Sequence, residues 1–298
     1  MSSQAPLQPT DWNIQRVLEW TTNYFKSHRI DSPRTTAEVL LAHALHLERI
    51  DLYLRYDQPL SRAERAVFKE FVRRRILHEP VAYITGSKEF WSMSFQVSPA
   101  VLIPRPDTEC LVEAALELLP REAADGPGRV LELGTGSGAI IVALASERRG
   151  HRYFASEKST AAAAQARENA RAHGLTDQIL FFCSDWFGAF RKGALPFDLI
   201  VSNPPYIAAE AIDGLEPEIA GFEPRLALDG DKDGLSALRQ IIRSAPPWLR
   251  PGGHLLLEIG FDQRTAVAAL AADCGAYGRT ACFRDYGGRD RVMQLTRV

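Results

Sequence analysis

The sequence predicts an α/β protein in which a mostly parallel, doubly wound sheet follows a small all-α N-terminal domain. Beyond residue 128, short apolar runs alternate with helical patterns, whereas the first 80 residues show only helical periodicity. A glycine-rich turn directly follows the first of these runs. At 298 residues the chain is long enough for about two domains. We expect a helical domain over 1–80, a β-hairpin and linker over 81–106, and the sheet domain over 107–298.

The N-terminal region carries helix signals in order. Apolar residues recur near helical spacing between Ile14 and Phe25, and Ser32-Pro33 offers an N-cap followed by a first-turn proline. Ser61-Arg62-Ala63-Glu64 has the form of a capping box and opens a third long helix. These signals favour a small helical bundle that ends before Pro80.

The apolar period changes to two between Ala82 and Val97, which predicts a β-hairpin that joins the two domains. The segment 103–109 follows, with two prolines that favour an extended chain and with Asp107, which can cap the next helix.

Five short apolar runs predict the strands of the sheet. They are Arg129–Leu133, Tyr153–Ser156, Ile179–Cys183, Phe197–Val201 and His254–Ile259. Helical patterns or long loops separate them, which favours parallel pairing. The segment 207–233 is an unusually long insertion, and such insertions tend to carry function.

Asn203-Pro204-Pro205-Tyr206 is the most informative motif, because it stands where the fourth run stops. Proline cannot donate to a sheet ladder and restricts the residue before it, so Pro204 and Pro205 end the strand and stiffen the turn. The motif supplies an amide, two rigid φ angles and an aromatic ring. This combination suits a grip on a small planar polar group and predicts methylation of a planar nitrogen.

The first run leads into Gly134-Thr135-Gly136-Ser137-Gly138, a strand–turn–helix signal for a bound nucleotide-like group. The glycines let the backbone turn sharply and approach a ligand, while free amides at the helix start face it. The spacing of Gly134, Gly136 and Ala139 also fits the dinucleotide fingerprint, and a tight structural turn is a further interpretation.

The next two runs end in acidic residues. Glu157 is placed to accept both ribose hydroxyls of an adenosine, although a solvent-facing glutamate would look the same. Asp185 could accept from an adenine amino group, and Trp186 could cover the base or pack in the core. Consecutive strand ends therefore carry glycines, an acid, and an acid beside an aromatic ring.

This succession, completed by Asn-Pro-Pro-Tyr at the fourth strand end, resembles the class I methyltransferases, which have a Rossmann-like sheet and depend on S-adenosylmethionine. The chain is similar along most of its length to a narrower family, the peptide-chain release factor N5-glutamine methyltransferases, also called the PrmC or HemK family. The strings that carry this resemblance include 83–86, 103–109, 132–138, 166–170, 222–228, 257–260 and 285–292. Glu157 departs from the pattern, in which Asp is commoner, but the longer carboxylate should still reach the ribose.

The resemblance implies methyl transfer from S-adenosylmethionine to the side-chain amide of the glutamine in a Gly-Gly-Gln motif, with class I release factors as partners. It implies that Gly134 to Gly138, Glu157 and Trp186 bind the cofactor and that Asn203 to Tyr206 hold the substrate glutamine. On physical grounds, the Asn203 side-chain oxygen and the Pro204 carbonyl could each accept one amide hydrogen, and Tyr206 could pack on the flat amide. Asp185 and Asn203 join the expected cofactor contacts.

Other substrate classes remain open at this level. Ribosomal-protein glutamine methyltransferases would share both sites, and adenine N6-methyltransferases of DNA or RNA use the same kind of clamp. The net charge of −2 disfavours a polynucleotide, because such enzymes need basic surface. A non-catalytic adaptor would predict a broken glycine turn or clamp, and both are intact. The helical domain is expected to recognise the protein partner or to serve stability alone.

Composition and sequence pattern argue against metal-binding, membrane-spanning and secreted proteins. Apolar residues make up 46% and charged residues 24% of the chain, as in ordinary globular proteins. The four cysteines are scattered singly, so we expect reduced core thiols and no metal site. No run approaches the roughly 20 apolar residues of a membrane span, and residues 1–6 lack the pattern of a signal peptide. A cytoplasmic location is the expectation.

Overall fold

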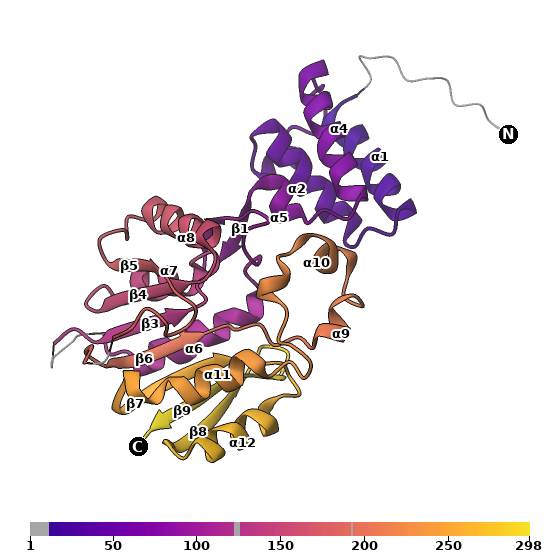
Figure 1. Cartoon of the computed structure of the whole chain (residues 1–298). Coiled ribbons are helices and arrows are strands. Elements are labelled where there is room, and N and C mark those ends of the chain that lie inside the picture. The colour runs from indigo at the N-terminus through magenta and orange to yellow at the C-terminus, as the bar shows by residue number, and fades with distance from the viewer. Residues whose placement is uncertain (1–11, 122–125, 192) are drawn as a thin grey trace. The chain divides into compact units, whose positions relative to one another are not determined.

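The computed structural model describes residues 12–121, 126–191 and 193–298. Residues 1–6, used above for the cytoplasmic expectation, lie outside this part. The chain divides into two compact units, one formed by residues 1–86 with 217–222 and the other by 87–216 with 223–298. Their helices and strands are labelled in Figure 1.

The helical unit has its own apolar core. Its helices are α1 (Ile14–Ser27), α2 (Pro33–Leu45), α3 (Arg49–Leu54), α4 (Arg62–Ile76), α5 (Val81–Thr85) and α10 (Pro217–Phe222). The predicted capping box is confirmed: Ser61 Oγ accepts from the Glu64 amide at 3.2 Å, and a Glu64 carboxylate oxygen accepts from the Ser61 amide at 2.7 Å. Pro33 occupies the first turn as predicted, but Ser32 takes a left-handed φ of 45° and makes no side-chain cap.

The hairpin is shorter than the period-two pattern suggested. Residues 81–85 form α5, and only β1 (Ser87–Phe90) and β2 (Met93–Gln96) pair as antiparallel strands. The hairpin belongs to the sheet unit, because the Asn169 side chain bonds both backbone groups of Gln96, at 2.8 and 3.0 Å. The expected linker over 81–106 is therefore divided between the two units.

Seven strands form one sheet in the order β5-β4-β3-β6-β7-β9-β8. Their bounds are β3 (Arg129–Leu133), β4 (Arg152–Glu157), β5 (Ile179–Cys183), β6 (Phe197–Ser202), β7 (Leu249–Glu258), β8 (Tyr277–Arg284) and β9 (Asp290–Arg297). The five predicted strands are confirmed and pair in parallel, whereas β9 pairs antiparallel with β7 and β8. β8 and β9 were not predicted; four of the eight residues of the edge strand β8 are exposed and only one is buried, so it lacks a clear apolar alternation.

Helices cover both faces of the sheet (Figure 1). One face packs on α6 (Glu109–Leu118), α7 (Ala139–Glu147) and part of α8 (Thr160–Ala172). The other packs on α11 (Ser236–Ser244) and α12 (Arg264–Cys274). Successive residues of β3 alternate between the two cores, with Val130 in the first and Leu131 in the second. This is the doubly wound arrangement that the sequence predicted.

Short helical turns connect the larger elements. They are η2 (Pro106–Thr108), η3 (Arg225–Ala227), η4 (Pro246–Trp248) and α9 (Ala209–Ile212). Asp107 lies inside η2 and makes no cap, contrary to expectation; its carboxylate pairs with Arg291 at 3.2 Å. Cys183 also differs from the expectation of core thiols, because it is exposed, while the other three cysteines are buried or half-buried free thiols. None of the described helices is long and apolar enough to cross a membrane.

The strand order creates a switch point at the carboxyl end of β3. The chain runs from β3 to β4 and β5 on one side and then returns to β6 on the other. Loops that leave the two sides diverge there, and open α/β sheets bind ligands in the resulting crevice.

Candidate active site

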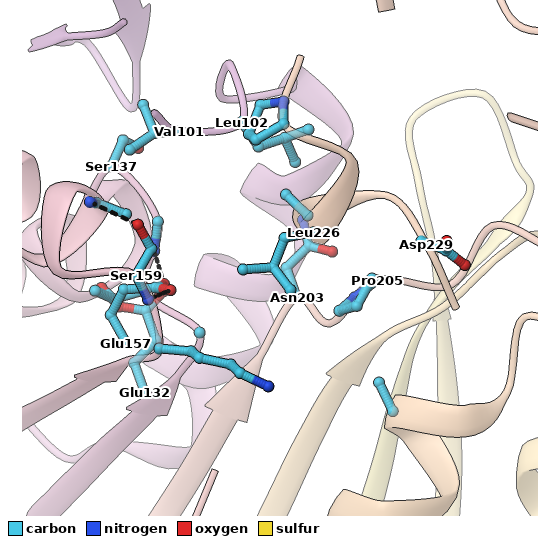
Figure 2. A pocket seen from close by; sticks show the side chains of 18 of the residues that line it. Val101, Leu102, Glu132, Ser137, Glu157, Ser159, Asn203, Pro205, Leu226 and Asp229 are labelled. Carbon is cyan, nitrogen blue, oxygen red and sulfur yellow. Dashed lines mark hydrogen bonds between the residues drawn. The ribbon is translucent and has the colours of Figure 1, made fainter. Parts of the chain in front are cut away.

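A cavity of about 680 Å³ lies at this switch point. Residues that follow β3, β4, β5 and β6 all contribute to its lining, together with parts of the 99–108 segment and the long insertion. Figure 2 shows Asn203 and Pro205 on one side of the cavity and Ser137, Glu157 and Ser159 on the other. The topology therefore brings four predicted strand-end signals to one place.

The glycine turn needs its glycines for two different reasons. Gly134, Gly136 and Gly138 have φ values of 69°, 55° and 82°, a region that side chains rarely enter. A Cβ on Gly136 would meet nothing within 4 Å, so this backbone is open to the cavity. A Cβ on Gly138 would instead lie 3.2 Å from the Ala166 backbone, so that glycine permits close packing of α7 on α8. Thr135 and Ser137 also line the cavity.

Glu157 holds the glycine turn from the end of β4. One carboxylate oxygen accepts from the Gly136 amide and the other from the Ser159 amide, each at 2.9 Å. The residue is only 8% exposed and lines the cavity. Each oxygen keeps a second lone pair, so the carboxylate can still accept from a ligand hydroxyl.

Asp185 and Trp186 follow β5 on the cavity wall. The Asp185 carboxylate pairs with Lys158 Nζ at 2.9 Å, and both side chains are more than half exposed. Trp186 takes a left-handed φ of 48°, and its ring lies 3.6 Å from where a Cβ on Gly134 would be. The same ring also packs against the core beneath, so Trp186 is both wall and packing residue.

The Asn-Pro-Pro-Tyr turn contributes two of its four residues to the cavity lining. Asn203 and Pro205 line it, whereas Pro204 and Tyr206 are not among the described residues that do. Tyr206 lies behind the turn, where its hydroxyl donates to a Glu258 carboxylate oxygen at 3.1 Å. Its carbonyl accepts from Gln263 Nε2 at 2.9 Å. The rigid turn is therefore anchored from beneath by the Tyr206 hydroxyl and carbonyl, and the packing of the Tyr206 ring on a substrate amide stays a prediction.

Sequence reasoning missed Glu132, which sits in the apolar strand β3 and lines the cavity. It is 1% exposed; one oxygen accepts from Thr135 Oγ1 at 2.5 Å, and the other has no partner among the described residues. Burial raises the pKa of Glu132 to about 8. A charge inside a buried strand is the signal that could have identified it.

The long insertion also reaches the cavity, as its length suggested. Leu226 and Asp229 line it, and nearby Glu223 accepts from the Ile103 amide at 3.2 Å. Glu223 forms an ion pair with Arg105 as well. The segments that precede α6 and follow β6 are thereby joined at the cavity rim.

Comparison with known proteins decides the family. Residues 16–86 match the PrmC N-terminal domain, and residues 111–216 match the methyltransferase small domain. The release factor glutamine methyltransferase of Geobacter sulfurreducens is 42% identical over 96% of this chain and 97% of its own length. That of Salmonella typhimurium is 44% identical over 88% and 91%.

The chain belongs to the release factor glutamine methyltransferase family. The resemblance inferred from its motifs is confirmed, and so is the expectation that it is a methyltransferase. A solved Thermus thermophilus 16S rRNA N2 G1207 methyltransferase, in complex with AdoMet and guanosine, is 21% identical and covers 71% of this chain and 50% of that one. Its TM-score of 0.51 supports a class I methyltransferase fold, and the match to the methyltransferase small domain lies within the sheet unit.

Proposed function

We propose that this enzyme transfers the methyl group of S-adenosylmethionine to the side-chain amide nitrogen, N5, of the glutamine in the Gly-Gly-Gln motif of class I release factors. The observation that carries the proposal is the shared cavity of Asn203 and the glycine turn. Family membership supports the substrate class and disfavours the ribosomal-protein and nucleic-acid alternatives. No separate observation favours a second function.

The residues of the cavity fit the cofactor. A backbone open at Gly136, a buried carboxylate at Glu157 and the Trp186 ring suit an adenosine and its ribose. We assign Gly134 to Gly138, Glu157, Asp185, Trp186 and Asn203 to cofactor binding. Asp185 would accept from the adenine amino group in competition with its ion pair to Lys158. When bound, S-adenosylmethionine supplies an electrophilic methyl on a sulfonium.

The chain must then orient a weak nucleophile. The lone pair of a carboxamide nitrogen is delocalised into the carbonyl, so alignment and stabilisation of the charge that develops on nitrogen do most of the work. In the proposed arrangement Asn203 Oδ1 and the Pro204 carbonyl each accept one hydrogen of the substrate NH₂ group. Pro205 and Tyr206 keep the turn rigid. Neither acceptor is a strong base, so the proton leaves late, to water.

The helical unit is assigned to recognition of the release factor, because a free glutamine would not require a second domain. Residues 16–86 match the PrmC N-terminal domain, so this unit is a feature of the family. The net charge of −2 supports a protein partner over a nucleic acid. We expect the enzyme to work in the cytoplasm and without a metal.

The test is a transfer assay with radiolabelled S-adenosylmethionine. The substrates are an intact class I release factor, the same factor with its Gly-Gly-Gln glutamine changed to alanine, and ribosomal proteins. We expect label on the intact factor alone. Label on the alanine form would exclude the proposed target residue, and label confined to ribosomal proteins would replace the substrate class.

A further inference from the structure

Residues 166–170 of α8 carry part of the family resemblance but are not among the described residues of the cavity lining. Ala166, Asn169 and Ala170 lie on one face of the helix, because residues three and four apart are neighbours there. All three are buried, whereas the two residues between Ala166 and Asn169 are exposed. The segment therefore turns a face of small residues to the interior, and Asn169 is the polar side chain in it.

The Asn169 side chain joins two segments that are far apart in the sequence. Its Oδ1 accepts from the Gln96 amide at 2.8 Å, and its Nδ2 donates to the Gln96 carbonyl at 3.0 Å and to the Ser137 carbonyl at 2.8 Å. The Gln96 amide can bond only to the oxygen of this side chain, so the orientation of the Asn169 carboxamide is fixed. Its nitrogen is therefore held toward Ser137.

Ser137 belongs to the glycine turn and lines the cavity. Asn169 holds its carbonyl from α8, and Glu157 accepts from the amide of the preceding residue, Gly136, at 2.9 Å. Two consecutive residues of the turn are thus held from opposite directions along the chain. Glu157 lines the cavity, whereas Asn169 is 1% exposed and is not among the described residues of the lining. Asn169 can therefore act on the turn without contact with a ligand.

The small residues beside Asn169 allow this contact. A Cβ on Gly138 would lie only 3.2 Å from the Ala166 backbone, so α8 and the turn approach closely. Glycine has the widest backbone freedom of all residues, and three glycines of this turn have positive φ values. Such a turn populates several conformations unless other groups hold it. The Asn169 hydrogen bond supplies such a restraint.

We propose that Asn169 is a positioning residue for the cofactor, which keeps the glycine turn in its binding conformation through the Ser137 carbonyl. The inference rests on the proposed function, which supplies S-adenosylmethionine as the ligand. It adds a residue outside the cavity lining that sets the affinity.

The proposal separates affinity from rate. A binding conformation that is only partly populated lowers the apparent affinity by that fraction. Once the cofactor is bound, its own contacts hold the turn. Asn169 should therefore affect the binding of S-adenosylmethionine and leave methyl transfer by the saturated enzyme almost unchanged.

The test compares Asn169→Asp with the wild-type enzyme. Aspartate has nearly the same shape and keeps an oxygen for the Gln96 amide, but when ionised it has no hydrogen to donate to Ser137. We expect calorimetric titration to show at least about tenfold weaker binding of S-adenosylmethionine. The single-turnover rate of transfer to a release factor, at saturating cofactor, should stay within about threefold.

A second variant and a second measurement guard against misfolding. Asn169→Ala removes the side-chain donor and introduces a strong helix former, so it carries the test if Asn169→Asp does not fold. It should show the same loss of affinity at an unchanged single-turnover rate. In both variants, amide hydrogen exchange of residues 134–138 without cofactor should be faster than in the wild type.

His173→Leu is the matched control, one helical turn further along α8. His173 Nε2 donates to the Ser94 carbonyl of the same hairpin at 2.8 Å, and among the described residues it forms no hydrogen bond with 134–138. The control therefore removes a contact with the hairpin but none with the glycine turn. Its cofactor affinity should stay within about twofold of the wild type. An equal loss in His173→Leu and Asn169→Asp would assign the effect to the hairpin and overturn the proposal.

The outcomes distinguish this proposal from the proposed function. A wild-type enzyme that does not bind S-adenosylmethionine, or that leaves the release factor unlabelled, contradicts the proposed function. A wild-type enzyme that does both, beside an Asn169→Asp enzyme of equal affinity, contradicts only the positioning role. Slower transfer at saturating cofactor with unchanged affinity would also contradict it.

Discussion

Asn203 is held in the site by neighbouring residues in the sequence and by a contact with a residue far away in the sequence. The prolines after it fix the local backbone, which the sequence alone makes evident. Its side-chain nitrogen donates to Thr108 Oγ1, 95 residues earlier in the chain. Local sequence patterns therefore predict that an amide stands at this strand end but not which distant residue it contacts.

Gly136→Ala is expected to weaken S-adenosylmethionine binding by more than tenfold, because its Cβ would occupy open cavity space. The strain of a left-handed alanine adds roughly 1–2 kcal/mol of destabilisation. Gly174→Ala is the matched control: its φ is 67°, a Cβ there also meets nothing within 4 Å, and it is not among the described residues of the cavity lining. Calorimetric titration with cofactor measures the difference. Equal affinities in the two variants would contradict the assigned role of Gly136.

The other site residues divide in the same way between local and distant causes. Glycines, acids and prolines at strand ends are recognisable by type and position, so Gly136, Glu157 and Asn203 were predicted to share one sheet edge, and the cavity contains all three. Glu258 went unnoticed, although a charged residue in an apolar run is a signal. Its hydrogen-bond donor, the Tyr206 hydroxyl, comes from the turn after β6, so only the folded chain shows that this carboxylate anchors the turn.

At the scale of elements, the parallel strands were predictable because both of their faces are buried. Runs such as Ile200 and Val201 are apolar without interruption, and the structure places them in opposite cores. The antiparallel strands β8 and β9 were not predicted; in β8, at the sheet edge, four of the eight residues are exposed and only one is buried. Likewise α5 is too short, at five residues, for a helical period to stand out from the hairpin.

Asp198 joins three central strands at the end opposite the cavity. Its carboxylate accepts from the Arg129 amide in β3 at 2.7 Å and from Arg250 Nε in β7 at 2.5 Å. Burial alone would raise the pKa of Asp198, but these two donors outweigh it and lower the pKa. Asp198→Asn should therefore reduce the free energy of unfolding by about 1–2 kcal/mol at pH 7.

The sign of its pH dependence follows from the lowered pKa. The stabilisation by Asp198 is complete at pH values above its pKa in the unfolded state, about 3.9. It is lost as the pH falls through the lower pKa of the folded state. Urea unfolding at pH 7 and at pH 3 should show the gap between wild type and Asp198→Asn narrowing at the lower pH. A gap that widens at pH 3 would contradict this account. Asp177→Asn, at an exposed position, should change stability by less than about 0.5 kcal/mol at either pH.

At the scale of the whole molecule, the helical unit includes a segment from far along the chain. Residues 217–222, from the insertion that follows the Asn-Pro-Pro-Tyr turn, form α10 within it. Arg75, only 2% exposed, donates to the Glu79 carbonyl at 3.1 Å and forms an ion pair with Glu218 in α10. The sequence predicted a functional insertion, but it did not indicate that part of the insertion joins the helical unit. A six-residue helix carries little periodic signal.

Arg75→Ala should release α10, because it removes a buried partner of Glu218. Limited proteolysis should then cut within 217–222 at least several times faster than in the wild type. Arg73→Ala is the control, since among the described residues Arg73 forms an exposed ion pair with Glu70 alone, at 2.7 Å. Equal cleavage rates in the two variants would show that the ion pair does not hold the segment.

Asn203→Ala tests the central claim that the Asn203 oxygen aligns the substrate amide. The decisive measurement is the single-turnover rate of methyl transfer to a release factor, taken with saturating S-adenosylmethionine whose affinity is determined in parallel. We expect transfer to fall by at least about 1,000-fold, the scale of a lost preorganised transition-state contact, while cofactor affinity changes by less than about threefold. An Asn203→Ala enzyme that still transfers methyl at near the wild-type rate would contradict the account.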